Sequence, residues 1–532
     1  MTQYQWRILV ADDILPEGLA LLRAAPDVLV DDLRLSRAEL LERLGDYDAV
    51  VVRSGTGVDR ELMERGAKLQ VIGRAGLAFD NIDVAAATER GIMVLNTPDA
   101  YSLAAAEHTM ALLLALCRHV PAADASVRAG AWERDRFLGA QLSGKLLGLV
   151  GLGRVGQLVA KRARAFGMLI MAYDPYAGEL EARDLDVTLA PLDEVLAQAD
   201  FLSLHSALTE ETRRLVGREE LARLKPSARL VNCARGELVD EAALAEALAH
   251  GRLAGAALDV FGSEPPVGSP LLGLPNVVLT PHLGSSTREA QRDVSVQVAR
   301  GVLAALQGSG YPNVVNLPFD AGDDFARTRP YLDLAERLGA LQAELAGSEL
   351  SGVEIEVKGP EVSGLVKAIA VALLKGLLGQ RLARPVNYVN APALAAERQL
   401  RVTQARGLET ADYANMISCR VSWSGGQRLV AGTLFGGQES RLVLLDEFRT
   451  DARPRGQVLI MFSRDVPGVI GIVGTLLFQY GVNIAEWRLG RDRPGGTALS
   501  FINLDSRVPP DGLVALRSLP QVIDVRSVLL PA

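Results

Sequence analysis

The sequence predicts an α/β protein with two Rossmann-like domains, the first of them flavodoxin-like, followed by an α+β domain and a ferredoxin-like βαββαβ domain. Three observations predict this class. Short strand-like runs alternate with helical runs up to residue 279, a glycine-rich segment directly follows an apolar strand, and the last 77 residues read strand, helix, strand, strand, helix, strand. At roughly 150 residues per domain, a chain of 532 residues accommodates three or four domains.

The first unit, residues 1–98, is predicted to be a parallel sheet, because its strands are separated by helical patterns. The turn Asn96-Thr97-Pro98 ends the unit. The apolar runs that predict its strands lie at 8–11, 49–52, 69–72 and 93–95.

The second unit, residues 99–283, opens with the apolar helix 104–116, and six strands follow it. The helix 287–306 beyond them matches nothing in this unit, so we expect the chain to return and pack on the first unit. The first domain would then be discontinuous, built from 1–98 and 284–315. Clefts between paired α/β units are common ligand sites.

The C-terminal part of the chain predicts two further domains. An α+β domain is expected over 316–453, then a linker at Pro454-Arg455-Gly456, then the ferredoxin-like domain over 455–532. The strands that predict the α+β domain are an alternating run and a hairpin pair, at 353–357, 428–435 and 441–448.

Composition narrows the function. Lysine and arginine total 56 against 64 acidic residues, a formal charge of −8, which argues against a nucleic-acid-binding surface. The three cysteines, at 117, 233 and 419, are too widely spaced for a disulfide scaffold or a cysteine zinc site, and no metal site is predicted. The N-terminus does not read as a signal peptide, and no apolar run reaches the roughly 18 residues that span a bilayer. We therefore expect a cytoplasmic protein without nucleic-acid or membrane partners.

A dinucleotide-binding motif opens the sheet of the second unit. Gly151, Gly153 and Gly156 form G-L-G-R-V-G after the strand LLGLV, and a helix follows. Gly151 permits the tight turn, Gly153 lets the backbone approach a pyrophosphate, and Gly156 lets helix and strand pack closely. The helix N-terminus offers its unpaired N–H groups to the phosphates. Asp174, 18 residues after Gly156, can accept hydrogen bonds from a ribose diol and would repel a 2′-phosphate, which predicts NAD rather than NADP.

Three polar residues follow three strands of the same unit. Arg235 lies in NCARGELVD, Glu264 in GSEPP and His282 in TPHLGSST. Because open parallel sheets place their ligands at the carboxyl ends of the strands, we expect these side chains to meet there. Histidine can exchange a proton near neutral pH, a carboxylate can orient it, and arginine can hold a carboxylate bidentately. The set predicts a hydride transfer between a hydroxyl and a carbonyl group.

These segments resemble the D-isomer-specific 2-hydroxyacid dehydrogenase family, together with VVRSGTGVD, NTPDAYSLAAAEH and LGLVGLGRVGQLVA. The middle domain is similar to the intervening domain of the long, four-domain members through VNYVNAPALAAER, and the last domain resembles an ACT domain through RDVPGVIGIVGTLL. The resemblance implies NAD-dependent oxidation of D-3-phosphoglycerate to 3-phosphooxypyruvate, the first step toward L-serine.

The resemblance also implies roles for individual residues. Arg235, Glu264 and His282 would be catalytic, with the histidine as acid–base and the glutamate setting its protonation. Beyond the glycines and Asp174, the implied cofactor contacts are Arg154, Val155, Ser206, Cys233, Ala234, Asp259, Gly284 and Ser285. The implied substrate contacts are Arg53, Ser54, Gly55 and Arg74, with Arg134 or Arg136 reaching a neighbouring subunit's site.

The last domain implies an effector, because ACT domains commonly bind amino acids between paired copies. L-serine is the implied effector, Asp465 and Asn483 are its implied ligands, and a homotetramer is the implied assembly. A purely dimerising domain is the alternative. The chain departs from the family where RAGLAFDN replaces the usual RAGTGVDN: Leu77 removes a polar contact near the cofactor and Phe79 adds bulk. We expect altered cofactor affinity rather than lost chemistry.

Two other functions remain open on the sequence. One is a reductase of glyoxylate or hydroxypyruvate, and the other is an NAD-sensing binding protein of the co-repressor type. Relatives of both kinds generally lack the two C-terminal domains, and both functions predict no dependence on serine.

Overall fold

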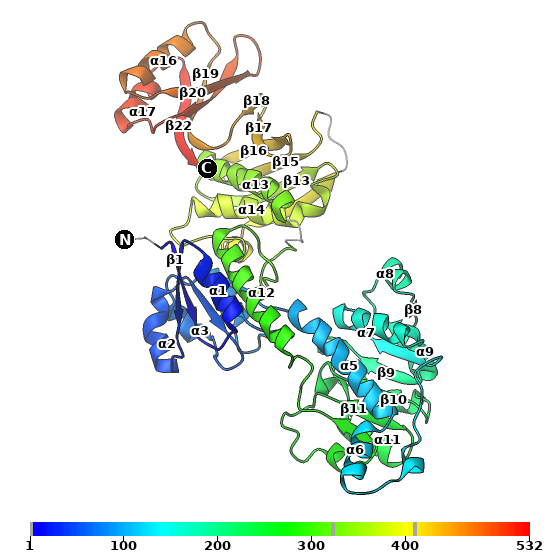
Figure 1. Ribbon diagram of the computed structural model, residues 1–532. Helices are drawn as coiled ribbons and strands as arrows, with labels where there is room; N and C mark the ends of the chain where they lie inside the picture. The colour runs from blue at the N-terminus through cyan, green and yellow to red at the C-terminus, as the bar shows by residue number, and fades with distance from the viewer. Residues whose placement is uncertain (1–3, 321–324, 408–411, 532) are drawn as a thin grey trace.

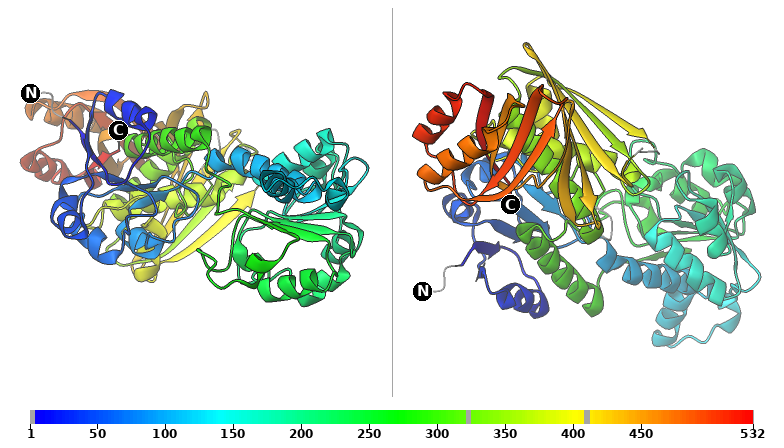
Figure 2. Two further views of the ribbon diagram at one scale, coloured as in Figure 1. Left: turned by 60° about the horizontal axis from the view of Figure 1, so that its bottom comes forward. Right: turned by 90° about the horizontal axis from the view of Figure 1, so that it is seen from above.

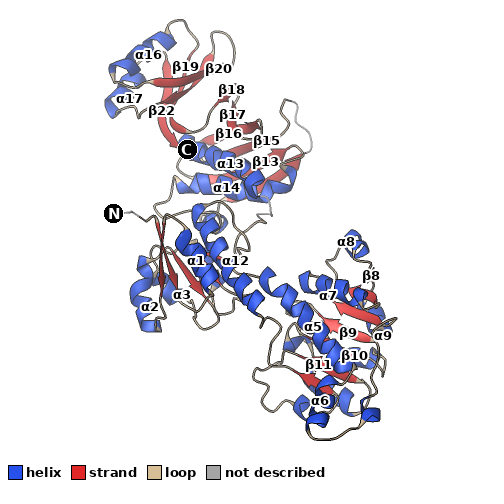
Figure 3. Ribbon diagram, in the orientation of Figure 1, coloured by secondary structure: helices blue, strands red, loops and turns tan. Residues whose placement is uncertain are grey.

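The computed structural model describes residues 4–320, 325–407 and 412–531. The described residues form four β-sheets that follow one another along the chain, each with helices packed on one face or both (Figures 1 and 3). The predicted fold class is confirmed: two parallel α/β sheets precede a mixed sheet and an antiparallel sheet.

The first sheet is parallel throughout, in the flavodoxin-like order β2-β1-β3-β4-β5. The sequence patterns missed the edge strand β2, because its run Val-Leu-Val-Asp-Asp ends in two aspartates and is only half-buried. The strands are β1 (Trp6–Val10), β2 (Val28–Asp32), β3 (Ala49–Val52), β4 (Val71–Arg74) and β5 (Met93–Leu95). The helices between them are α1 (Pro16–Ala24), α2 (Arg37–Arg43), α3 (Arg60–Arg65) and α4 (Val84–Arg90).

The chain returns to this sheet through α12 (Arg288–Gln307), which lies beside α1 in Figure 1. Thr287 caps the helix by accepting a hydrogen bond from the amide of Ala290, and Gly308 ends it in the left-handed conformation at φ 62°. The helix packs so closely on β4 that a Cβ at Gly73 would lie 2.6 Å from a methyl carbon of Val302. Residues more than 190 positions apart therefore share one core.

The second sheet has the order β12-β11-β10-β9-β6-β7-β8, all parallel, with β6 at the point where the connections reverse direction. This is the Rossmann arrangement, and its ligands lie at the carboxyl ends of the strands near that point. The strands are β6 (Leu146–Val150), β7 (Leu169–Tyr173), β8 (Thr188–Leu189), β9 (Phe201–Leu204), β10 (Arg229–Asn232), β11 (Gly255–Leu258) and β12 (Val277–Leu279). The longer helices around them are α5 (Ser102–Cys117), α6 (Val120–Arg128), α7 (Arg154–Ala165), α9 (Leu192–Gln198) and α11 (Glu241–Ala249).

Helix α5 and the short 3₁₀ turn before it, η2 (Asp99–Tyr101), carry the chain from the first sheet to the second. By length and composition the segment 99–117 could cross a membrane, with a mean hydropathy of 1.4, whereas the sequence analysis expected no such run. In the structure 56% of this segment is buried, and α5 packs against α7, β10 and β11. It thus packs as a core helix of the second unit.

The third sheet is mixed, in the order β14-β13-β15-β16-β17-β18, and α13 and α14 pack together beside it. The predicted second hairpin strand 441–448 is wrong in its extent. It breaks at Asp446, where φ is 52°, and Phe448 begins a separate strand. The elements are α13 (Phe325–Leu345), β13 (Leu350–Lys358), α14 (Val366–Gly379), α15 (Ala391–Glu397), β14 (Arg401–Gly407), β15 (Met416–Trp423), β16 (Gly426–Phe435), β17 (Glu439–Leu445) and β18 (Phe448–Ala452).

The fourth sheet is antiparallel in the order β20-β21-β19-β22, with α16 and α17 on one face, which is the ferredoxin-like arrangement. It abuts the third sheet, as the right view of Figure 2 shows, and the two sheets share one hydrophobic cluster. The elements are β19 (Gly456–Arg464), α16 (Val469–Gln479), β20 (Ile484–Arg491), β21 (Thr497–Leu504), α17 (Pro510–Arg517) and β22 (Val522–Leu530).

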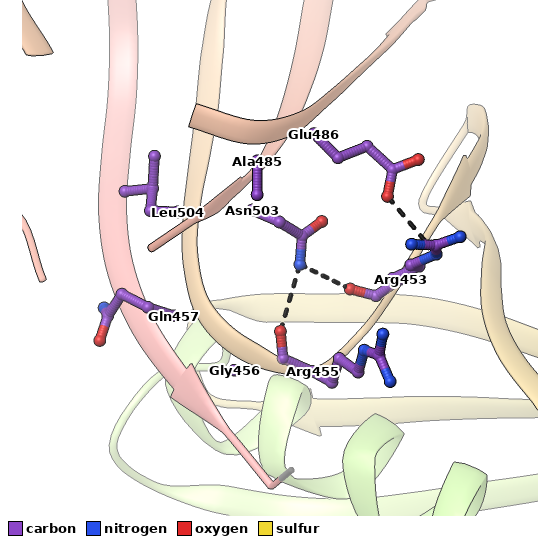
Figure 4. Close-up of a pocket in the computed structure, with 8 residues that line it drawn as sticks. All are labelled: Arg453, Arg455, Gly456, Gln457, Ala485, Glu486, Asn503 and Leu504. Carbon is purple, nitrogen blue, oxygen red and sulfur yellow. Dashed lines mark hydrogen bonds and ion pairs between the residues drawn. The ribbon is translucent and has the colours of Figure 1, made fainter. Parts of the chain in front are cut away.

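A polar pocket of about 390 Å³ lies at the junction of these two sheets (Figure 4). The Asn503 amide nitrogen donates to the main-chain carbonyl oxygens of Arg453 and Arg455, at 3.0 and 3.1 Å. The Arg453 guanidinium faces Glu486, 3.7 Å away, and pairs with Glu439 at 2.8 Å. These contacts bind Arg455 of the predicted linker to the fourth sheet, and they bind the preceding Arg453 to both sheets.

Candidate active site

The glycine-rich loop has the geometry of a phosphate cradle. Gly151 has φ 97°, and a Cβ there would lie 2.7 Å from the carbonyl carbon of His205, so only glycine fits. A Cβ at Gly156 would lie 2.3 Å from the carbonyl oxygen of Gly151, so this glycine lets α7 pack against the loop. A Cβ at Gly153 would meet no atom within 4 Å, so the space in front of it is open.

The residues around this cradle fit a dinucleotide. Helix α7 begins at Arg154 without a side-chain cap on its N-terminal N–H groups. Such a helix end attracts phosphate. Asp174 follows β7, and its carboxylate accepts hydrogen bonds from the amides of Leu152 (2.8 Å) and Tyr176 (2.9 Å). These two bonds hold the acidic group beside the glycine loop, where a ribose would lie.

Arg235 is positioned by a tight loop after β10. The side chain of Asn232, which is fully buried, donates to the carbonyl oxygen of Arg235 (2.8 Å) and accepts from the amide of Ala234 (3.0 Å). Gly236 allows close packing, because a Cβ there would lie 2.0 Å from the carbonyl carbon of Phe261. The half-buried guanidinium group is therefore carried by a rigid turn.

His282 and Glu264, predicted from separate motifs, are in direct contact. Nδ1 of His282 lies 2.8 Å from Oε2 of Glu264, and the other carboxylate oxygen of Glu264 accepts from the amide of Phe261 at 3.1 Å. Both side chains are partly exposed, at 50% and 39%. The contact leaves Nε2 of His282 free of Glu264, which is the arrangement of a general acid–base histidine oriented by a carboxylate.

Asp259 anchors the loop that carries His282. Its fully buried carboxylate accepts hydrogen bonds from the hydroxyl of Thr280 (2.6 Å) and from the amides of Leu283 and Gly284 (both 2.7 Å). Burial by itself would raise the pKa of Asp259, but the hydrogen bonds from His108, Thr280 and the two amides outweigh it and lower the pKa to about 2. Asp259 is therefore a buried anion that organises the loop.

Arg53 extends from the loop after β3, and two polar side chains shape this loop. Asp12 accepts from the amide of Arg53 (2.6 Å) and from the hydroxyl of Thr56 (2.9 Å). Asn81 donates to the carbonyl oxygens of Arg53 (2.7 Å) and Thr56 (2.6 Å). Within the described residues, the amide N–H groups at positions 54 and 55 have no acceptor, so they are available to an anion.

A second arginine and a tyrosine lie next to Arg53. Burial lowers the pKa of Arg74, and Tyr101 interacts with Arg74 electrostatically. Burial raises the pKa of Tyr101. The positive charges of Arg53 and Arg74, and a hydrogen-bonding interaction with Arg53, act against this rise. This part of the first unit can therefore hold an anionic group.

One side chain links this cluster to the histidine loop. Gln291 on α12 accepts from Arg53 (2.9 Å) and donates to the carbonyl oxygen of Ser285 (3.3 Å). Arg53 and Gln291 also line a pocket of about 260 Å³ together with Ala75. The predicted anion site and the predicted catalytic loop therefore meet where the two α/β units join.

The other predicted cofactor residues lie around the same edge. The Arg154 side chain turns away from its own helix end and pairs with Asp99 at 2.8 Å. The Ser206 hydroxyl donates to the carbonyl oxygen of Val150 (3.1 Å). Burial raises the pKa of the Cys233 thiol to about 12, so this thiol is not a nucleophile at neutral pH.

Two further expectations concern the departure from the family pattern and the effector site. Leu77 is exposed, and Phe79 is partly buried against the core of the first sheet. Asp465 accepts from the amide of Gly495 (2.9 Å), and Asn483 donates to Asp505 (2.6 Å). The structure records no contact between Asp465 and Asn483.

Several residues that shape this region were not predicted from the sequence: Asp12, Asn81, Tyr101, His108, Asn232 and Gln291. Asp12 and Asn232 carried a usable signal, because each is a polar residue at the end of an apolar strand. The others lie on helices or loops, and only contacts with distant segments give them a role.

Among the described residues there is no cluster of three or more metal-binding side chains. Comparisons with known proteins agree with the geometry. The family model for the NAD-binding domain of D-isomer specific 2-hydroxyacid dehydrogenases matches residues 110–284, and that for the D-3-phosphoglycerate dehydrogenase intervening domain matches residues 327–446.

Whole-chain relatives extend this match. D-3-phosphoglycerate dehydrogenase of Synechocystis sp. is 41% identical over 510 residues, covering 96% of this chain and 92% of that protein. D-3-phosphoglycerate dehydrogenase of Methanocaldococcus jannaschii is 42% identical over 520 residues, covering 98% of this chain and 99% of that protein. A crystal structure from Thermus thermophilus is 42% identical with a TM-score of 0.53, covering 58% of this chain and 99% of that one.

Proposed function

Because this chain belongs to the D-3-phosphoglycerate dehydrogenases of the D-isomer-specific 2-hydroxyacid dehydrogenase family, we propose that it oxidises D-3-phosphoglycerate to 3-phosphooxypyruvate with NAD. The observation that carries the proposal is the 2.8 Å contact between His282 and Glu264, beside a glycine-rich dinucleotide loop. The reaction supplies the first intermediate of L-serine synthesis, and we place it in the cytoplasm.

The proposed roles follow from the contacts. NAD, when bound, supplies the acceptor for the hydride that leaves C2 of the substrate. His282 takes the hydroxyl proton on Nε2, and Glu264, on Nδ1, stabilises the imidazolium cation that forms. Arg235 binds the substrate carboxylate and polarises the carbonyl group as it develops.

The cofactor contacts divide into backbone and side-chain groups. Gly151, Gly153 and Gly156, with the N–H groups at the start of α7, would hold the pyrophosphate, and Asp174 would hold the ribose diol. The remaining proposed cofactor residues are Arg154, Val155, Ser206, Cys233, Ala234, Asp259, Gly284 and Ser285.

The substrate phosphate has a proposed site in the first unit. Arg53 and Arg74 supply charge, and the amides of Ser54 and Gly55 supply N–H donors that have no acceptor among the described residues. Arg134, in the exposed turn η3 (Arg134–Phe137), would contribute from a second subunit. The neighbouring Trp132 and Leu138 are 80% and 87% exposed, which favours an interface between subunits at this turn.

The assembly and its control are also proposals. A homotetramer formed through the second and fourth units would pair the ferredoxin-like domains, and L-serine would bind between them near Asp465 and Asn483. We assign residues 1–98 and 284–315 to the substrate-binding domain, 99–283 to the NAD-binding domain, 316–453 to the intervening domain and 455–532 to the ACT domain.

The test is the initial rate of NADH formation from D-3-phosphoglycerate and NAD at alkaline pH, with and without L-serine. We expect turnover that is lost in His282→Ala and falls when serine is added. Turnover that is insensitive to serine would refute the effector and leave the reaction intact. Absence of turnover in a protein that still binds NAD would refute the reaction and direct attention to glyoxylate reduction or NAD sensing.

A further inference from the structure

The segment from η2 into α5 touches every part of the proposed site. At its start Asp99 pairs with Arg154 of the cofactor loop at 2.8 Å, and Tyr101 interacts electrostatically with Arg53 of the anion site. Two turns of helix later, His108 reaches the loop that carries His282. Helix α5 also lies on the strands β10 and β11 that precede Arg235 and Asp259. One rigid element therefore contacts all three subsites.

The contact made by His108 is specific. Its Nε2 lies 3.2 Å from Oδ1 of Asp259 and 3.1 Å from the hydroxyl oxygen of Thr280, and the ring is 19% exposed. The Thr280 hydroxyl donates to the same Asp259 oxygen at 2.6 Å. Because Asp259 is ionised, Nε2 must carry a hydrogen, since a bare nitrogen lone pair would repel the carboxylate. His108 is therefore a hydrogen-bond donor to the buried anion.

The partner of His108 is the anchor of the catalytic loop. The amides of Leu283 and Gly284 donate to the carboxylate of Asp259 at 2.7 Å. The amide of His282 donates to the main-chain carbonyl oxygen of Asp259 at 2.9 Å. His282 itself has φ 54°, a left-handed conformation that is unfavourable for a non-glycine residue and persists only where neighbours impose it. A displaced Asp259 would therefore release the loop from its strained form.

The loop also packs directly on α5. A Cβ at Gly284 would lie 3.2 Å from Oδ2 of Asp259 and 3.9 Å from Cα of Ala105. Ala105 stands three residues before His108 on the same helix, so the loop meets α5 at two adjacent points. Displacement of α5 relative to β11 and β12 would move the catalytic histidine.

We propose that His108 is a positioning residue for the dehydrogenation: its hydrogen bond to Asp259 keeps the His282 loop in register with α5. His108 touches neither substrate nor cofactor in this account and acts through Asp259. The inference rests on the proposed function, because it concerns the same catalytic loop. It adds a role for His108, which lies in the segment NTPDAYSLAAAEH but received no role from the resemblance.

The test compares His108→Leu, which removes the donor, with His108→Gln, whose amide can still reach Asp259. We expect His108→Leu to lower kcat roughly 10- to 100-fold, as small misplacements of catalytic groups do, and His108→Gln to recover most of that loss. We also expect the primary isotope effect on kcat, with substrate deuterated at C2, to rise in His108→Leu, because hydride transfer then becomes rate-limiting. A residue that only stabilises the core would lower Tm without changing this isotope effect.

The matched control is Glu107→Gln on the same helix. Glu107 pairs with Arg162 at 3.3 Å and does not contact the His282 loop. The kcat of this variant should stay within two-fold of the parent value. Thr280→Val removes the other side-chain donor to Asp259 and should reproduce the loss if His108→Leu does not fold. A folded His108→Leu protein with parental kcat, or an equal loss in His108→Gln, overturns the inference. The unaltered protein is assayed alongside the variants. If the unaltered protein itself shows no turnover, the proposed dehydrogenase function has failed, and this outcome is distinct from a failure of the inference about His108.

Discussion

Replacing Asp259 by asparagine tests the buried anion on which the catalytic loop depends. The carboxylate is an acceptor for four donors, from His108, Thr280 and the amides of Leu283 and Gly284. Asparagine keeps the size of the side chain, but it removes the charge and places an NH₂ group among donors. Stability and the position of the loop should both suffer.

The magnitude follows from the pKa of Asp259. The folded protein lowers this pKa to about 2, against roughly 3.9 for an unfolded chain. A lowered carboxyl pKa contributes stability that is fully present above the unfolded value and is lost as the pH falls through the folded value. A pKa difference of about two units corresponds to ~2.6 kcal/mol near neutral pH, and roughly half of that remains at pH 3. Asp259→Asn should lose about this amount at pH 7 and converge with the parent as the pH falls from 4 toward 2.

The assay is calorimetric unfolding of both proteins at pH 7, 5 and 3, following the transition that NADH shifts to higher temperature. For a domain of this size, ~2.6 kcal/mol corresponds to a Tm lower by about 5–10 °C. The difference should be nearly constant between pH 7 and 5 and begin to shrink below pH 4. A Tm difference under 1 °C at pH 7, or one that grows as the pH falls, would refute the reasoning.

Three further predictions concern the chemistry and the cofactor. Glu264→Gln should lower kcat about 5- to 30-fold in initial-rate assays, because a half-exposed carboxylate stabilises the imidazolium of His282 by about 1–2 kcal/mol; an unchanged kcat would contradict its role. Gly153→Ala should leave Tm of the ligand-free protein unchanged, since its Cβ meets nothing within 4 Å, yet raise the NADH Kd at least ~10-fold by fluorescence titration; unimpaired binding would place the pyrophosphate elsewhere. Asp174→Asn should raise the ratio of kcat/KM for NADP to that for NAD at least ~10-fold, because it removes repulsion of a 2′-phosphate; an unchanged ratio would show that another group excludes NADP.

In the two α/β sheets the sequence predicted the strands that lie inside and missed two at the edges. In the third sheet it also missed the inner strand β15 and the edge strand β14. Buried central strands such as β6 are unbroken apolar runs, which leave a clear local pattern. The edge strand β2 ends in aspartates, and β8 has two residues, so neither leaves enough pattern to be found. A strand that pairs with a neighbour on one side alone needs fewer apolar residues. Whether it forms depends on the strand that it joins.

The sequence by itself predicted the candidate groups of the site and the strand ends at which they stand. The glycine motif, Arg235, Glu264 and His282 were all found this way, because turns and strand ends depend on residues next to one another in the chain. Only the tertiary structure decided how these groups are held. His108 and Asp259 are 151 positions apart, and Arg53 and Gln291 are 238 positions apart. Such contacts exist only after helices and sheets have packed, and no local periodicity records which side chains packing will bring within hydrogen-bonding distance.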